Sequence, residues 1–193
     1  EVSGLLALSE AVHVIEREQA DVMVVGAVGA RLSPARLIYR TPSLYNARPV
    51  SQDPPGCLPF DRRRAGIVPA EGSAVMTIER RSHAVRRGAK ILGKVLGVGC
   101  GCGRPKEHYA GSALALSQSI QAALEEAGCT ADELSHVSAQ GFSAQALDRS
   151  EAAAIAGSLA DLPVCAHSSY FGTPGASSGL MNLIASLLAD RKS

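Results

Sequence analysis

The chain has 193 residues, of which 46% are hydrophobic, so it is long and apolar enough to build a core and is not expected to be disordered. Nineteen basic and eighteen acidic side chains leave a formal net charge of +1, which excludes a global attraction to nucleic acid or to an anionic membrane. Only 4% of the residues are aromatic and none is Trp, which disfavours a stacking platform for single-stranded nucleic acid.

The cysteines show neither a metal-site pattern nor a disulfide framework. Five of them lie at positions 57, 100, 102, 129 and 165, an odd number without a CxxC pair. No apolar run approaches the roughly eighteen residues that cross a bilayer, and the opening segment carries acids where a leader would be basic. These features predict a protein of the reducing cytoplasm, without a metal, a nucleic-acid partner or a membrane partner.

The first sixty residues predict a helix, a strand and a long surface segment. Apolar residues at helical spacing predict a helix over residues 2–19. The dense apolar run of residues 21–30, bounded by Asp and Gly, predicts a strand that is buried on both faces. Residues 33–60 contain six prolines and no clean period, which predicts an excursion over the surface.

The middle of the chain continues this alternation of strands and helices. Residues 66–80 regain strand character, and residues 82–89 predict a brief helix that stops at Gly88. The alternating pattern of residues 90–102 predicts a further strand. Residues 111–128 are the clearest amphipathic segment and predict a helix that ends at Gly128.

The last third of the chain predicts two more short strands and two helices. Residues 136–141 are expected to form a strand and turn, residues 147–159 a helix, and residues 162–167 a short strand. Residues 175–190 predict a final apolar helix whose start is rich in Gly and Ser. Helices that alternate with buried strands predict an α/β layered fold, and no internal repeat is visible.

Three turns are candidates for a site, because ligands in open α/β sheets gather where strands end and helices begin. They are residues 139–142, residues 168–173 and the start at Glu1. The Gly-rich stretch 169–179 could cradle a phosphate, but it lacks the GK[ST] ending of a P-loop, and close packing of a helix on a sheet explains it as well. His167 precedes two serines, so a serine hydrolase is a further alternative, although sequence neighbours need not be hydrogen-bonded in space.

One dense basic grouping is present. Arg62, Arg63 and Arg64 are followed by four more arginines between residues 80 and 87. Such a grouping is either a solvated surface or a dock for an acidic partner, and the sequence leaves both interpretations open.

Four segments carry recognisable motifs. Residues 1–11 are similar to a CATG..AIGEA helix, and residues 59–72, from Pro59-Phe60-Asp61-Arg62 onward, to PFD-x-x-R-x-G-F-x-x-GEG. Residues 139–151 are similar to AHGT-x-T-x-x-x-D-x-x-E, and residues 168–179 run ungapped along KSxxGHxxGAAG. Together these segments resemble the β-ketoacyl synthase family of condensing enzymes. The resemblance implies a thiolase-like α/β fold, which is layered α/β/α/β/α in the whole family.

The resemblance also places the family's boundaries on this chain. Members of the family have an N-terminal half before the nucleophile and a last strand pair after the helix of the second His. Residues 1–193 are therefore expected to represent a ketosynthase-like region that runs from the nucleophile-position helix through most of the C-terminal half. The N-terminal half and the last strands of the family are not expected within it.

The residues at the family's catalytic positions differ in this chain. The nucleophilic Cys, the two His, the Lys before the second His and the two Thr that bind phosphopantetheine are matched, in that order, by Glu1, Gln140, Thr173, Ser168, Phe142 and Ala144. A carboxylate cannot form the acyl thioester, and neither an amide nor a hydroxyl titrates near pH 7 as imidazole does. The resemblance therefore predicts a fold without the condensing chemistry.

These substitutions lead to two hypotheses of function. The first is a non-condensing partner of an active ketosynthase in fatty acid or polyketide biosynthesis, similar to a chain-length factor, that forms a heterodimer or homodimer. The alternative is an acyltransferase or decarboxylase that acts on acyl carrier protein through an unusual site. No cofactor is expected, although the phosphopantetheine of a carrier protein could enter as a substrate arm, and Arg62, Arg63 and Arg64 are candidate contacts for that acidic carrier.

Overall fold

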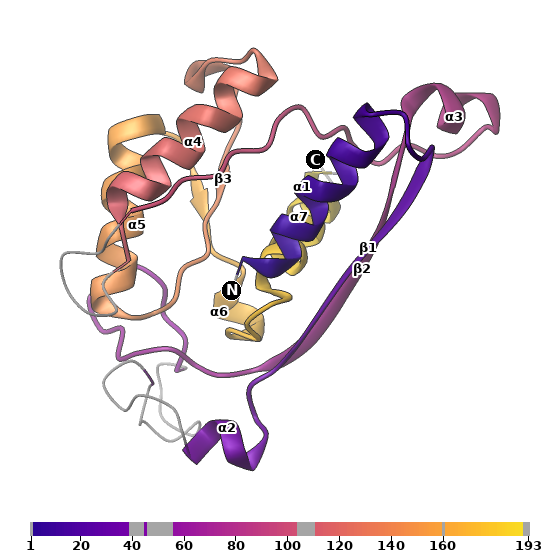
Figure 1. The fold of residues 1–193 in the computed structure, drawn as a ribbon. Helices are drawn as coiled ribbons and strands as arrows, with labels where there is room; N and C mark the ends of the chain where they lie inside the picture. Colours follow the sequence, from indigo (N-terminus) through magenta and orange to yellow (C-terminus); the bar gives the residue numbers. More distant parts are fainter. Residues whose placement is uncertain (1, 39–44, 46–55, 104–110, 160, 191–193) are drawn as a thin grey trace.

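The computed structural model describes residues 2–38, 45, 56–103, 111–159 and 161–190. In Figure 1 a long two-stranded ribbon, β1–β2, runs along one side of the molecule, and α4, α5 and β3 lie on the other side. Helices α1 and α7 lie between these two parts. Strands and helices thus form layers, as the alternating pattern predicted.

The ribbon is antiparallel and covered on one face by two helices. Strand β1 (Val22–Ala30) pairs with β2 (Glu71–Glu79) so that Val22 lies opposite Glu79 and Ala30 opposite Glu71. Helix α1 (Ser3–Glu16) and helix α7 (Ser178–Asp190) pack on this ribbon. Their shared core consists of the buried residues Leu8, Ala11, Val25, Ala74 and Leu180.

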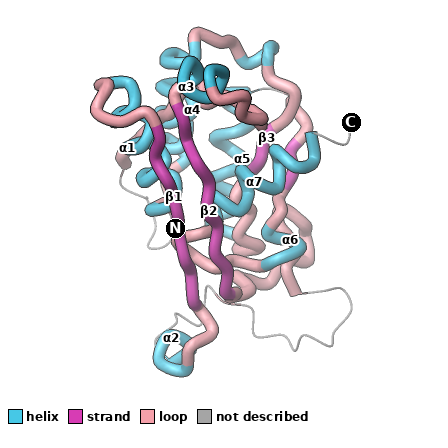
Figure 2. The backbone as a smooth tube through the Cα atoms, turned by 90° about the vertical axis from the view of Figure 1, so that its right-hand side faces the viewer, coloured by secondary structure: helices cyan, strands magenta, loops and turns pink. Residues whose placement is uncertain are grey.

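The other face of the ribbon has no cover among the described residues. Val24 and Val28 of β1 are 70% and 74% exposed, and Val75 of β2 is 66% exposed. Figure 2 shows the two strands in front of the helices. The strand predicted over residues 21–30 is confirmed, but the prediction that it is buried on both faces is wrong, because α1 and α7 cover only the side that carries Val25.

Close backbone contact fixes the segment before α7 against this ribbon. A Cβ atom at Gly29 would lie 2.0 Å from the carbonyl oxygen of Pro174, so only Gly fits at this point of β1. The Ser177 hydroxyl donates to the Gly72 carbonyl at 2.9 Å, and the Thr173 amide donates to the Val68 carbonyl at 2.8 Å. Residues 173–177 are thereby held on the end of the sheet.

Two short helices flank the ribbon. Helix α2 (Pro34–Ile38) follows β1, and α3 (Arg81–Arg86) follows β2 and is followed by Gly88 at φ +68°. Arg87 donates two hydrogen bonds to the Glu79 carboxylate, at 2.7 and 2.6 Å. The hydrogen bonds from Arg87 and His83 lower the pKa of Glu79 to about 2.

Residues 90–102 do not form the predicted strand. No strand partner is assigned to them among the described residues, and they run extended along helix α4 (Ala113–Ala127). Cβ atoms at Gly97, Gly99 and Gly101 would lie 2.5, 1.9 and 2.0 Å from carbonyl oxygens of α4. The alternating sequence pattern of this segment therefore arises because every second residue packs on helix α4. A β-strand would also need hydrogen bonds to the backbone of a neighbouring strand.

The second half folds around two short parallel strands. Helix α4 begins at Ser112, whose hydroxyl accepts from the Ala115 amide, and is followed by Gly128 at φ +64° and a short 3₁₀ turn, η1 (Ala131–Glu133). Strands β3 (Val137–Ser138) and β4 (Val164–Cys165) pair in parallel, with α5 (Gln145–Leu159) between them in the chain and α6 (Ser168–Phe171) after them. The predicted helices at 111–128, 147–159 and 175–190 are confirmed.

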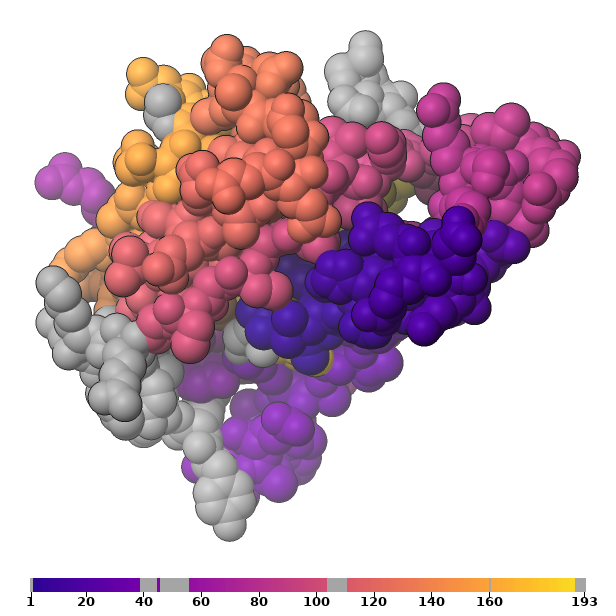
Figure 3. All heavy atoms as spheres, turned by 45° about the horizontal axis from the view of Figure 1, so that its top comes forward, coloured from indigo at the N-terminus to yellow at the C-terminus, as the bar shows by residue number. Residues whose placement is uncertain are grey.

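The packing of α7 makes it the central helix. In Figure 3 the indigo α1 and the coral α4 both lie on the face toward the viewer, whereas the yellow α7 is almost hidden.

None of the helices in the described part of the chain is long and apolar enough to cross a membrane.

Candidate functional site

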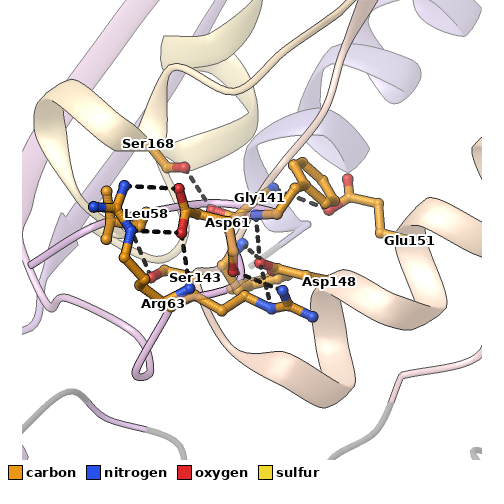
Figure 4. A network of polar contacts seen from close by, with 11 residues as sticks. Leu58, Asp61, Arg63, Gly141, Ser143, Asp148, Glu151 and Ser168 are labelled. Carbon is orange, nitrogen blue, oxygen red and sulfur yellow. Dashed lines mark hydrogen bonds and ion pairs between the residues drawn. The ribbon is translucent and has the colours of Figure 1, made fainter.

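A network of hydrogen bonds joins three segments that lie far apart in the sequence. These are the loop of residues 57–64, the loop of residues 139–144 and the start of α5. Figure 4 shows their side chains converging next to α6. Two of the four recognised motifs supply these segments, and Ser168 of a third motif donates to the Gly141 carbonyl, so three motifs meet in one structural unit.

Asp148 lies at the centre of the network. Its side chain is 1% exposed, and its two oxygens accept from the Phe60 amide at 2.9 Å and from the Phe142 amide at 2.8 Å. The Arg64 guanidinium lies 3.5 Å from the same carboxylate. Burial raises the pKa of Asp148, and these donors oppose that rise. The carboxylate therefore ties the loop after Pro59 to the loop after β3.

Glu151 fixes the loop that carries Gln140. Its carboxylate accepts from the Gln140 amide at 2.7 Å and from the Gly141 amide at 2.9 Å. Burial is also the main cause that raises the pKa of Glu151. Gly141 has φ +56°, and a Cβ there would lie 2.7 Å from Pro59, so this position requires glycine.

Ser143 closes the same loop in a way that the sequence did not reveal. It is fully buried at φ +62°, its hydroxyl accepts from the Leu58 amide at 3.0 Å, and its carbonyl accepts from the Gly66 amide at 2.8 Å. A serine between Phe142 and Ala144 gives no sequence signal for a left-handed backbone. The resemblance drew attention only to its two neighbours.

Ser168 is a buried structural contact in this arrangement. Its hydroxyl donates to the Gly141 carbonyl at 2.5 Å. The buried Cys57 thiol interacts with the same hydroxyl, and burial raises the pKa of Cys57 to about 11. His167 has a different neighbour, because its Nδ1 lies 3.4 Å from the Ser138 hydroxyl. Since Ser168 and His167 have different partners, this geometry does not favour the serine-hydrolase alternative.

Gln140 and Thr173 present buried polar atoms without a partner. Within the described ranges, neither the Gln140 Nε2 nor the Thr173 Oγ1 has a hydrogen-bond partner, and Thr173 is fully buried. Asn182 of α7 behaves similarly: its Nδ2 donates to the Ala139 carbonyl at 3.4 Å, while its Oδ1 has no partner in the described structure. Asn182 was not predicted as a site residue, because its place in an apolar helix suggested only packing.

The remaining predicted positions have different surroundings. Phe142 is half-buried and Ala144 is buried, and each contributes its backbone to the hydrogen bonds around Asp148. A role of either residue in a phosphopantetheine channel stays a prediction. Glu1 lies outside the described residues.

The three consecutive arginines do not form a uniform patch. Arg63 donates to both oxygens of the Asp61 carboxylate at 3.1 Å, and this hydrogen bonding lowers the pKa of Asp61 to about 2. Arg64 is turned inward, with its side chain 16% exposed, toward Asp148. Arg62 is exposed. Carrier-protein docking through this cluster stays a prediction.

Two family profiles match most of the chain. "Beta-ketoacyl synthase, N-terminal domain" matches residues 2–84, and "Beta-ketoacyl synthase, C-terminal domain" matches residues 92–192. The tetracenomycin polyketide synthase ketoacyl synthase alpha subunit of Streptomyces glaucescens is 34% identical over an alignment of 196 positions, which covers 97% of this chain and 45% of that subunit. The chain thus spans less than half the length of this relative.

Solved structures of the same kind superpose on the chain. The ishigamide ketosynthase/chain length factor gives a TM-score of 0.80 at 27% identity, over 97% of this chain and 45% of that one. A chain from a solved complex of a type II polyketide acyl carrier protein with its ketosynthase gives a TM-score of 0.86 at 26% identity. The superposition covers 97% of the present chain and 47% of that one. The described structure is therefore part of a thiolase-like ketosynthase fold, as the resemblance implied.

Proposed function

Because the chain belongs to the β-ketoacyl synthase family, we propose that it acts in polyketide biosynthesis as a non-condensing, chain-length-factor-like partner of an active ketosynthase. Its task would be to help shape the cavity in which a partner extends the acyl chain. One solved neighbour, the ishigamide ketosynthase/chain length factor, supports an assembly of this kind.

One observation carries the proposal: the hydrogen-bond framework around Asp148 and Glu151 is complete, whereas the positions aligned with the two catalytic His hold Gln140 and Thr173. An amide and a hydroxyl donate hydrogen bonds but do not exchange a proton near pH 7. The residues that hold the loops are thus present, whereas the imidazoles that would transfer protons are absent. This combination fits an architectural role better than condensation.

Reconstitution of polyketide assembly tests this proposal. A ketosynthase, here the tetracenomycin polyketide synthase ketoacyl synthase alpha subunit, is incubated with malonyl-loaded acyl carrier protein, with and without this chain, and products are measured by mass spectrometry. We expect the chain to change the distribution of product lengths while showing no condensation alone. An identical distribution with and without the chain would contradict the proposal.

A second candidate function rests on the buried donors at Gln140 and Thr173. Two donors without partners can hold the carbonyl oxygen of a thioester as negative charge develops on it, which would support decarboxylation or acyl transfer. The purified chain should then release CO2 or free acid from malonyl- or acyl-carrier protein, and Gln140→Ala should slow that release. No turnover by the unaltered chain would exclude this candidate.

The proposed partners follow from the same family role. An acidic carrier protein would deliver its phosphopantetheine arm past Phe142 and Ala144, and Arg62 and Arg63 would be the exposed members of the three candidate docking arginines. A structure of a carrier protein with its ketosynthase among the solved neighbours supports this partner. The cytoplasm is the proposed compartment, since five cysteines without a disulfide pattern suit a reducing environment.

A further inference from the structure

Two free, exposed cysteines lie one residue apart in the segment that packs on α4. They are Cys100 and Cys102, and Gly101 separates them. Neither cysteine belongs to one of the four motifs or to the hydrogen-bond network around Asp148. The proposed function therefore leaves these two thiols without a role.

The neighbouring glycines fix the direction of the two cysteine side chains. Cβ atoms at Gly99 and Gly101 would lie 1.9 and 2.0 Å from carbonyl oxygens of α4, and one at Gly103 would lie 2.6 Å from the hydroxyl that caps this helix. Alternate residues of an extended chain point to opposite sides. The side chains of Cys100 and Cys102 therefore point together away from α4. This direction is set by contacts within the described chain.

The same contacts decide what can bridge the two thiols. Residues i and i+2 of an extended chain lie roughly 6.6 Å apart, because the rise is about 3.3 Å per residue, and Cβ atoms that point the same way lie about as far apart. A disulfide needs Cβ atoms about 3.5–4.5 Å apart, so Cys100 and Cys102 would have to move backbone that is packed on α4. Two sulfurs in a tetrahedral metal site lie about 3.8 Å apart, because the metal–sulfur bonds are about 2.3 Å long. Side-chain rotation alone brings the two sulfurs to that separation.

We propose that Cys100 and Cys102 form a two-thiolate site that chelates one thiophilic metal ion, of which Zn²⁺ is the type. Binding forms two metal–sulfur bonds and breaks two S–H bonds, and both protons pass to water. Among the described residues no group of three His, Cys, Asp or Glu side chains is placed to hold a metal, so water or an added ligand would complete the coordination. A CxC pair supplies only two ligands, which is why the cysteine spacing alone predicted no metal. The proposal does not depend on the proposed function.

The other three cysteines are unsuited to such a site. Cys57 is buried. The Cys129 thiol donates to the Ala127 carbonyl at 3.6 Å, and the Cys165 thiol donates to the Val137 carbonyl at 3.5 Å. Each of these thiols also lies far from the others in the sequence, so the chain carries its own control residues.

Calorimetric titration of the phosphine-reduced chain with Zn²⁺ tests the site. We expect one ion per chain, and we expect Cys100→Ser and Cys102→Ser each to weaken binding by about tenfold or more, because one of two linked ligands is lost. Cys129→Ser is the matched control and should leave the affinity within about twofold. Both cysteines of the site are exposed, so their serine variants should fold.

Two outcomes of this titration would overturn the proposal. One is the absence of zinc binding to the unaltered chain. The other is binding of two ions per chain, with each serine variant removing one ion and leaving the affinity for the second unchanged, because that result describes two independent thiols.

Alkylation and oxidation give a second readout. Saturating Zn²⁺ should slow the modification of Cys100 and Cys102 by iodoacetamide at least about tenfold and leave the rate at Cys129 unchanged, because the metal occupies the reacting thiolates. Equal slowing at all three would overturn the assignment. With oxidised glutathione we expect a mixed disulfide at each thiol, detected by peptide mass. Rapid formation of a Cys100–Cys102 disulfide would contradict the fixed spacing on which the site rests.

Discussion

The buried carboxyl groups of Glu151 and Asp148 should make the stability of the chain depend on pH. Burial raises the pKa of Glu151 and of Asp148 above their values in an unfolded chain, so the native state binds more protons in that interval. The free energy of unfolding should therefore fall as pH rises from the unfolded to the folded pKa of these groups. Acidification within that interval should have the opposite effect.

Glu151→Gln should reduce this pH dependence, because the amide does not titrate. The measurement is urea unfolding followed by circular dichroism at a series of pH values from 4 to 8, which spans ordinary carboxyl titration and above. Glu16→Gln, at an exposed position of α1, is the matched control and should leave the slope unchanged. A variant at position 151 with the slope of the unaltered chain would contradict the assignment.

The buried Cys57 thiol should react with an alkylating reagent much more slowly than the exposed thiols of Cys100 and Cys102. Cys57 is buried with a pKa of about 11, whereas Cys100 and Cys102 are exposed. At pH 8 we expect iodoacetamide to modify Cys100 and Cys102 at least ~100-fold faster than Cys57, because the thiolate is the reacting species. Peptide mapping after timed quenching measures the rates. Equal rates would show that the loop of residues 57–64 opens freely.

The site was predictable only where motif residues also carry the structure. Asp148 and Glu151 were recognised as the acids of a motif, and both proved to hold loops. Ser143 and Asn182 were missed, because a left-handed serine and a polar residue in an apolar helix leave no pattern in one sequence. The packing of three separate segments decides which buried polar atoms lack hydrogen-bond partners. The spacing of residues within one segment therefore could not predict them.

Among the elements, helices were predicted better than strands. Helix α4 carries its own signals, a Ser112 cap at its start and Gly128 at its end, so local chemistry sufficed. Residues 90–102 have the alternation of a strand but pack on α4, and β1 has the dense apolar run of a buried strand but one open face. In both cases the outcome depends on which neighbours are present, which the segment itself does not specify.

Helix α4 should be sensitive to any side chain added along the segment that packs on it. A Cβ at position 99 would lie 1.9 Å from the Ser119 carbonyl oxygen, so Gly99→Ala should lower the free energy of unfolding by about 1–3 kcal/mol. Gly157→Ala within α5 is the control, because nothing lies within 4 Å of its Cβ, and it should raise stability by about 0.5–1 kcal/mol. Thermal unfolding compares the two variants. A neutral Gly99→Ala would contradict the close packing of this segment on α4.

At the scale of the whole molecule, low net charge coincides with exposed apolar surface. The formal charge is +1, the isoelectric point is about 7.9, and several valines and leucines are largely exposed. Because charge repulsion is weakest at the isoelectric point, we expect solubility of the isolated chain to be lowest near pH 8 and to rise toward pH 6. Light scattering of concentrated samples measures this. A solubility that does not vary with pH would contradict it.

The Glu151 carboxylate holds the loop after β3 only through its backbone. It accepts hydrogen bonds from the backbone amides of Gln140 and Gly141, and neither bond uses the side chain at position 140. The path of the chain there is thus independent of the group displayed at that position. Side chains of different chemistry can therefore occupy position 140 without removing either of the hydrogen bonds that hold this loop.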